Sequence, residues 1–181
     1  MNEPDRLAAL AEQVTYLTSR QEIADCLARA ARGTDRHDGE LIVSAFHDDA
    51  VDEHGADVQG MPDFAAAVNA RHAEVTRAHT HNLTTHSCEI VGDEAHAETY
   101  VLAGLALKDE ETARLCGARY VDRLERREGI WKISFRRVVI DWIMAGDASS
   151  FHDPEYRQMG YPEGRWGHDD TSYERPLRFM G

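Results

Sequence analysis

The sequence has little cysteine, and what it has is unsuited to cross-linking. Among its 181 residues only Cys26, Cys88 and Cys116 are present, far apart in the chain. An odd number of cysteines without metal-ligand spacing predicts free buried thiols, and it argues against a disulfide framework or a cysteine-based zinc site. We therefore expect a reducing compartment and a cytoplasmic location.

Positive charge and long apolar runs are also scarce. The 20 Lys and Arg residues are outnumbered by 33 Asp and Glu residues, which gives a formal net charge of −13. Binding to nucleic acid or to anionic membranes depends on Lys and Arg, so we expect neither partner. No apolar run approaches the ~20 residues of a membrane span. The first residues also lack the basic and then apolar pattern of a secretion signal.

Several catalytic signatures are absent as well. The sequence has no glycine-rich dinucleotide fingerprint, no phosphate-binding loop and no His-Glu-x-x-His zinc motif. It also has no Gly-x-Ser-x-Gly nucleophile elbow. These absences disfavour nicotinamide enzymes, kinases and nucleophilic hydrolases, and we expect no cofactor.

Helical patterns fill the first half of the chain. A short helix is predicted over residues 3–17, where leucines and a valine share one side. A second helix is predicted to begin at Ser19, whose hydroxyl would cap the first turn, and to end at Gly33. Further helices are predicted over residues 40–46 and 62–77.

The second half alternates between apolar and polar residues. This pattern predicts strands over residues 79–91, 94–107, 112–126 and 130–144, joined by short turns. Helices followed by long antiparallel strands indicate an α+β domain with helices on one face of a curved sheet. We assign this domain to residues 1–145. The aromatic-rich tail, residues 146–181, lacks periodicity and is expected to dock on the domain or on a neighbouring subunit.

The strongest chemical signal is a group of histidines that opens the first long strand. Alternation places His79 and His81 on one face and His86 on the other. His79 and His81 would suit a metal if His54 or Asp52 completed the set, but no firmly placed third ligand is identified, and we expect no metal. His79 and His86 are instead interpreted as solvent-exposed.

The acid that follows the second predicted helix is the natural partner for His81. Asp35 lies just past the predicted helix end, held by a rigid element. If it faces His81 across the concave side of the sheet, the two form an acid–base pair in which the carboxylate orients the imidazole. The alternative is that Asp35 and Asp38 only solvate a turn or cap the next short helix.

Other candidates depend on which face of a strand they occupy. His54 would donate a hydrogen bond to a leaving oxygen, or would lie on the surface. One of Arg136 and Arg137 is expected to face inward and stabilise a developing anion, or to form an ordinary ion pair. A final group would line an apolar cavity or serve as ordinary core: Tyr100, Tyr120, Trp142 and Met144.

The order of these features resembles the SnoaL-like family of the nuclear transport factor two-like superfamily, in its dehydratase and dehydrochlorinase branch. The resemblance covers roughly residues 7–142. It is carried by Asp35, by His81 in a His-x-x-Thr pattern and by the strand pair YVDRLERREGIWKISFRRVVIDW. It implies a cone-shaped α+β barrel with N-terminal helices on the concave face of a mostly antiparallel sheet. It also implies an Asp35–His81 dyad, a catalytic Arg136 and a homo-oligomer, either a trimer or a dimer.

The chain also departs from the family pattern. Ala30 stands where the dehydrochlorinase has a lysine and the dehydratases a tyrosine, and His54 replaces a second tyrosine. We expect a cofactor-independent, dehydratase-like lyase that acts on a small apolar cyclic or aromatic substrate. His81 would take a proton, and His54 or Arg136 would assist the leaving group. The alternatives are an isomerase, a cyclase, a formaldehyde-releasing retro-aldol lyase, or a non-catalytic ligand-binding or subunit module.

Overall fold

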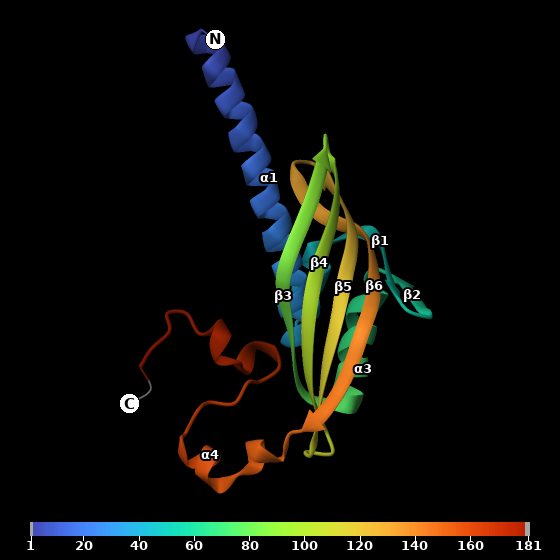
Figure 1. Ribbon diagram of the computed structural model, residues 1–181, viewed down its shortest axis with the longest axis vertical. Helices are drawn as coiled ribbons and strands as arrows, with labels where there is room; N and C mark the ends of the chain where they lie inside the picture. Colours follow the sequence, from blue (N-terminus) through green and yellow to red (C-terminus); the bar gives the residue numbers. More distant parts are fainter. Residues whose placement is uncertain (1, 180–181) are drawn as a thin grey trace.

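Helices lead into a long-stranded sheet in the computed structural model, which describes residues 2–179 (Figure 1). A short tail with small helical turns follows the last strand. The elements in chain order are α1 (Glu3–Asp35), α2 (Gly39–Ala45), β1 (Phe46–His54), β2 (Asp57–Gly60), α3 (Asp63–Val75), β3 (Thr76–Val91), β4 (Glu94–Leu107), β5 (Thr112–Arg127), β6 (Ile130–Asp147), η1 (Ser149–His152), α4 (Pro154–Gln158), η2 (Gly167–Asp169) and η3 (Thr171–Tyr173).

The sheet has six strands in the order β2-β1-β6-β5-β4-β3. All neighbours pair antiparallel except β1 and β6, which run parallel. The expected α+β fold is therefore confirmed, with one difference from a barrel. The edge strands β2 and β3 do not pair with each other, so the sheet stays open and does not close into a barrel. The helices cover its concave side.

The core lies between the concave face of the sheet and α1, α2 and α3. Ile23 and Leu27 of α1 are fully or almost fully buried, as are Leu124 and Ile133 of the sheet. Burying each such side chain contributes about 1.5–3 kcal/mol. This packing fixes how far the C-terminal half of α1 reaches along the sheet, and so it fixes the position of Asp35.

The predicted boundaries of the main helix are wrong at both ends. α1 runs without interruption through Ser19, which is buried in mid-helix, and the cap is Asn2, whose side chain accepts a hydrogen bond from the amide of Asp5 at 2.9 Å. No helix breaker separates the two predicted helices, so they join. At the other end Gly33 is still helical, and the left-handed residue is His37, with φ of 52°.

Gly33 serves a close approach instead of a helix stop. A Cβ atom at this position would lie 2.7 Å from the backbone nitrogen of Ile42 and 3.1 Å from the carbonyl oxygen of Asp38. The missing side chain therefore lets α2 fold back tightly on α1. α2 begins at the cap Asp38, whose carboxylate accepts a hydrogen bond from the amide of Leu41 at 2.9 Å.

A bulge in β3 changes the face on which His86 lies. The pairing between β3 and β4 shifts between Leu83 and His86, so His86 returns to the side occupied by Leu83. There its Nδ1 lies 2.9 Å from the hydroxyl of the buried Thr99. The prediction of an exposed His86 on the opposite face is therefore wrong, because strict alternation does not survive a bulge.

The tail passes back over the turn between α1 and α2. Trp166 stacks on His37 with ring centroids 3.8 Å apart, and the amide of Gly167 donates a hydrogen bond to the carbonyl oxygen of Arg36 at 2.5 Å. Tyr173 donates its hydroxyl proton to Asp38 at 2.7 Å. In the described residues, no helix is long and apolar enough to cross a membrane.

Candidate active site

Asp35 and His81 form a closed hydrogen-bonded pair between the end of α1 and β3. The Oδ1 atom of Asp35 lies 2.6 Å from Nδ1 of His81, and Oδ2 accepts the backbone N–H of His81 at 2.9 Å. Both side chains are largely buried, with 13% and 10% of their surface exposed. An acceptor-only carboxylate at Nδ1 holds the proton on that nitrogen, which leaves Nε2 free to accept another.

His79 is buried, contrary to the expectation that it is exposed. Only 3% of its surface is accessible, because β3 begins at Thr76 and runs under α1 and α3. Its Nε2 lies 3.0 Å from the carbonyl oxygen of Thr34, and its Nδ1 lies 3.3 Å from the Thr76 hydroxyl. Burial lowers the pKa of His79, so its ring stays neutral near pH 7.

His81 borders a small, partly enclosed cavity between the helices and the sheet. The cavity holds about 330 Å³ of empty space, but the centre of a water molecule fits in only about 20 Å³ of it. Aromatic and aliphatic side chains alternate with ionisable ones around it. The wall consists of Ala30, Thr34, Phe46, Asp52, His54, Phe64, Val68, His72, His81, Tyr120, Arg136 and Val138.

A second imidazole–carboxylate pair lies on the same cavity wall. Nδ1 of His54 is 3.5 Å from Oδ1 of Asp52, and Asp52 is 1% exposed. Neither carboxylate oxygen of Asp52 has a hydrogen-bond partner. A buried carboxyl group without a partner is costly, and such groups gather at functional sites. His54 is about one-third exposed and therefore stands at the edge of the cavity.

Of the two adjacent arginines, Arg136 faces the cavity and Arg137 faces solvent. Arg136 is 5% exposed and donates two hydrogen bonds to the buried Asp122, at 2.8 and 2.9 Å. Its guanidinium also lies 4.0 Å from the centre of the Tyr120 ring. Burial opposes its charge, but Asp122 outweighs burial and raises the pKa of Arg136. Arg137 pairs with Glu53 at the surface.

Three of the four expected substrate-binding residues do not line this cavity. Tyr120 does. The side chains of Tyr100, Trp142 and Met144 are 46%, 45% and 56% exposed and lie on the convex face of the sheet. Alternation in the sequence assigns residues to one of two faces of a strand but does not show which face meets the helices. The assignment of these three residues to the cavity is therefore corrected.

The sequence analysis named Asp52 only as a possible metal ligand and did not identify His72 at all. Asp52 alternates with Val51 and Glu53, and its position two residues before His54 was the available signal, since i and i+2 share a face. His72 sits in the last turn of α3, where no sequence pattern marked it. Its ring centre lies 5.6 Å from that of His81.

A comparison with protein families places this geometry in a known group. The model of the SnoaL-like domain matches residues 15–137, more than half of the chain. The chain belongs to the SnoaL-like domain family. The match spans α1 from its middle, both helices that follow, and the sheet through Arg137 in β6. It therefore includes Asp35 and every residue on the cavity wall except Val138. A comparison with curated proteins finds no significant match.

Solved structures share the SnoaL-like fold of this chain. Hexachlorocyclohexane dehydrochlorinase LinA-type3 from Novosphingobium barchaimii is 25% identical with a TM-score of 0.69, covering 74% of this chain and 94% of that chain. A putative scytalone dehydratase from Novosphingobium aromaticivorans is 17% identical with a TM-score of 0.67, covering 73% and 90%. A Mycobacterium tuberculosis protein of unknown function is 28% identical with a TM-score of 0.62, covering 69% and 77%.

Proposed function

We propose that this SnoaL-like protein is a cofactor-independent lyase that carries out a dehydratase-like elimination on a small, largely apolar cyclic or aromatic substrate. The observation that carries the proposal is the 2.6 Å contact between Asp35 and His81, whose imidazole lines a small, partly enclosed cavity. The structural similarity of this chain to a dehydrochlorinase and to a putative dehydratase supports the same class of reaction.

His81 is the proposed base. Asp35 accepts the Nδ1 proton, so Nε2 carries the lone pair that removes a proton from a substrate carbon. The imidazolium formed in this step is stabilised by the adjacent carboxylate. The second bond from the backbone of His81 to Asp35 keeps the pair from turning apart. The aromatic and aliphatic side chains on the cavity wall limit access of water to the pair, which strengthens these interactions.

His54 and Arg136 are the proposed partners of the leaving group. Both line the cavity that His81 borders, and His54 is backed by Asp52. As the carbon–oxygen bond of the substrate breaks, His54 in its imidazolium form, with Asp52 as its counter-charge, would donate a proton that converts the departing hydroxide to water and leaves a neutral imidazole. Two of the three guanidinium nitrogens of Arg136 are held by Asp122, so Arg136 contributes its charge from a fixed position.

The size of the cavity limits the substrate and its route of entry. The cavity has room for about one water molecule, so it must widen before any ring can enter. Asp35 and His81 also border an open groove formed with Arg32, Arg36 and Ser172. The substrate would approach from this side or past His54, which is about one-third exposed, so we propose a compact, single-ring substrate.

The proposal is tested by incubating the protein with a panel of cyclic and benzylic alcohols that carry an acidified β-hydrogen, with loss of one water detected by mass spectrometry. His81→Ala should lower turnover about 10²–10⁴-fold while circular dichroism stays unchanged. His96→Gln is the matched control, because His96 is exposed and pairs only with Glu94. Equal activity in the His81→Ala and wild-type proteins would exclude the mechanism.

An isomerase in the same cavity is the second candidate, because imidazoles on two sides, His81 and His54, also suit moving a proton from one carbon to another. Reaction in deuterated water separates the two. An isomerase yields a product of unchanged mass plus incorporated deuterium, whereas elimination yields a product lighter by one water. If no panel member reacts and none binds, the non-catalytic module is the remaining interpretation.

A further inference from the structure

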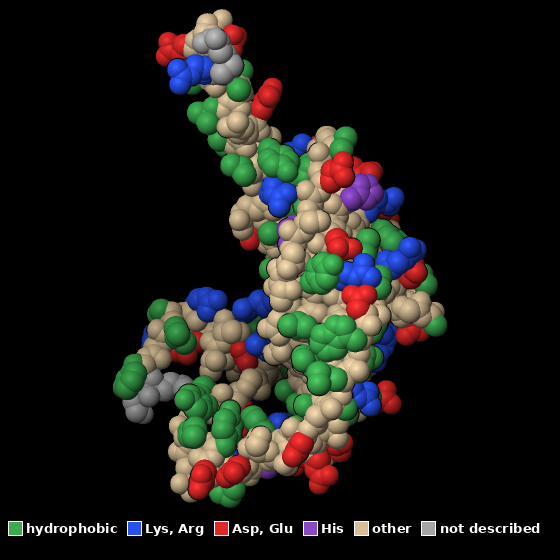
Figure 2. Space-filling view, in the orientation of Figure 1, with side chains coloured by type: hydrophobic (Ala, Val, Ile, Leu, Met, Phe, Trp, Pro, Cys, Tyr) green, Lys and Arg blue, Asp and Glu red, His purple; other side chains and the backbone are tan. Residues whose placement is uncertain are grey.

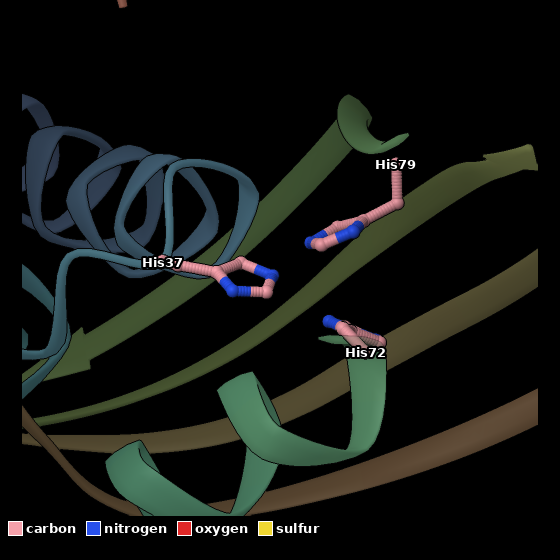
Figure 3. Close-up of side chains that lie close together, drawn as sticks. All are labelled: His37, His72 and His79. Carbon is pink, nitrogen blue, oxygen red and sulfur yellow. The ribbon is translucent and has the colours of Figure 1, made fainter. Parts of the chain in front are cut away.

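Three imidazoles converge beside the dyad, each from a different element. His37 lies in the turn after α1, His72 in the last turn of α3 and His79 at the start of β3 (Figure 3). One nitrogen of each ring lies within 4.8 Å of the corresponding nitrogens of the other two. The ring centres of His72 and His79 are 4.1 Å apart, and those of His37 and His79 are 5.2 Å apart.

We propose that His37, His72 and His79 bind a divalent transition-metal ion of the Zn²⁺ class. Neutral imidazole is a preferred ligand of Zn²⁺, and three histidines leave a fourth position for water. Zn–N bonds of about 2.0–2.1 Å in tetrahedral geometry place ligand nitrogens about 3.3 Å apart. The rings therefore need to close by up to about 1.5 Å from their present separation of 4.8 Å or less.

Unpartnered nitrogens point to a ligand. Nε2 of His37 and Nδ1 of His72 are inaccessible to solvent and have no hydrogen-bond partner among residues 2–179. Leaving a buried polar atom unpaired costs about 1–3 kcal/mol, a cost that a metal ion would remove. Three imidazole rings packed together without a metal ion would still bear this cost.

His79 has the surroundings of a metal ligand. Its Nε2 lies 3.0 Å from the carbonyl oxygen of Thr34, which accepts that N–H and so leaves Nδ1 as the ligand. Among the described residues, the one hydrogen-bond partner of Nδ1 is the Thr76 hydroxyl at 3.3 Å, and that hydroxyl already donates to the carbonyl of His72 at 2.8 Å. Binding through Nδ1 therefore gives up only the longer contact.

The backbone and the tail hold the His37 ring toward the other two rings. His37 adopts a left-handed φ of 52°, and Trp166 stacks on its ring with the ring centroids 3.8 Å apart.

A competing set, Asp35, His79 and His81, satisfies the same distance criterion. It is the weaker site because its donors already serve one another. Both carboxylate oxygens of Asp35 accept hydrogen bonds from His81. A metal there would break the hydrogen bonds between Asp35 and His81. A metal bound by His37, His72 and His79 would displace only the 3.3 Å contact between His79 and Thr76. The proposed metal site is independent of the proposed elimination, in which no step involves a metal.

Metal binding is tested on the full-length, untagged protein after removal of metal with a chelator. Zn²⁺ is titrated in competition with a chromophoric chelator, and Co²⁺ is added separately to record the visible absorption of tetrahedral coordination. We expect one ion per chain. His37→Gln and His72→Gln should each weaken the affinity about 100-fold or more, since even indirect partners of metal ligands contribute 10–100-fold.

Two further variants make the result decisive. His96→Gln, in an exposed histidine, and His81→Gln, in the dyad, should both bind Zn²⁺ like the wild type. His37 lies in a surface turn, so His37→Gln reports on binding even if His72→Gln fails to fold. The proposal is overturned by no stoichiometric binding, by unchanged affinity in His37→Gln, or by loss of binding in His81→Gln alone, which would place the ion on the dyad.

Discussion

The carboxylate of Asp35 holds His81 at two points, the Nδ1 atom at 2.6 Å and the backbone N–H at 2.9 Å. These contacts join residues that are 46 positions apart in the chain. They tie the C-terminal end of α1 to the N-terminal half of β3, and they fix the orientation of the imidazole ring. The fold itself therefore sets the relative position of Asp35 and His81.

Asp35→Asn should lower turnover about 10²–10⁴-fold with little loss of fold. An amide can accept one of the two hydrogen bonds, but it neither compensates an imidazolium nor favours the required tautomer. Steady-state kinetics and circular dichroism measure the two effects. Asp48→Asn, in an exposed acid of β1, is the matched control and should retain full activity. Parallel losses in both variants would contradict a specific role for Asp35.

Gly33→Ala should destabilise the protein by about 1–3 kcal/mol. The new Cβ would lie 2.7 Å from the nitrogen of Ile42 and force α2 away from α1. Gly39→Ala is the control, because nothing lies within 4 Å of a Cβ there. Urea unfolding compares the free energies of unfolding. Equal stability of the two variants would show that α2 does not pack as closely as described.

The docked tail should weaken in acid through Asp170. This carboxylate is 6% exposed and accepts hydrogen bonds from the amides of Arg165 and Ser172. Burial acts to raise its pKa, but these bonds and the charge of Arg36 outweigh burial and lower the pKa to about 2. The undocked carboxyl group keeps its ordinary value of 3.8. Its stabilising contribution is therefore complete above pH 3.8 and is lost as the pH falls toward 2.

Hydrogen exchange of residues 165–173 between pH 4 and 2 measures this effect. Protection should fall with pH in the wild type, whereas Asp170→Asn should show low protection and a flatter pH response. Asp169→Asn, in an exposed neighbour, should behave like the wild type. A pH response that survives in Asp170→Asn would assign the tail contact to other groups.

The convex face of the sheet is the surface through which we propose that copies of the chain associate. Apolar side chains gather there over β4–β6 (Figure 2), among them Tyr100, Leu115, Trp142 and Met144. The Trp142 indole lies across Gly117, which has no side chain, so its outer surface is presented flat. Contiguous exposed apolar surface of this kind typically marks an interface.

Trp142→Glu should lower the molar mass measured by light scattering from that of a dimer or trimer to that of a single chain. A charge in the middle of an apolar interface loses hydration without gaining a partner. Val91→Glu, at an exposed valine that ends β3, should leave the mass unchanged. A wild-type protein that elutes as a single chain at all concentrations would refute the proposed interface.

Local patterns in the sequence were enough to predict the α+β class, the four long strands and the approach of Asp35 to His81. Strand alternation and turn residues are local properties, and they persist in the fold. The location of Asp35 beyond a stripe of Ile23 and Leu27 also follows from local pattern, because a helix that buries this stripe carries its own end to the sheet.

Tertiary structure decided the rest. Alternation defines two faces of a strand but not which one meets the helices, so Tyr100 and Trp142 were placed on the wrong side. The bulge before His86, the buried position of His79 and the meeting of His37 with His72 all depend on contacts between distant segments. Such contacts are set by how the helices and sheet pack together, and no local pattern records them.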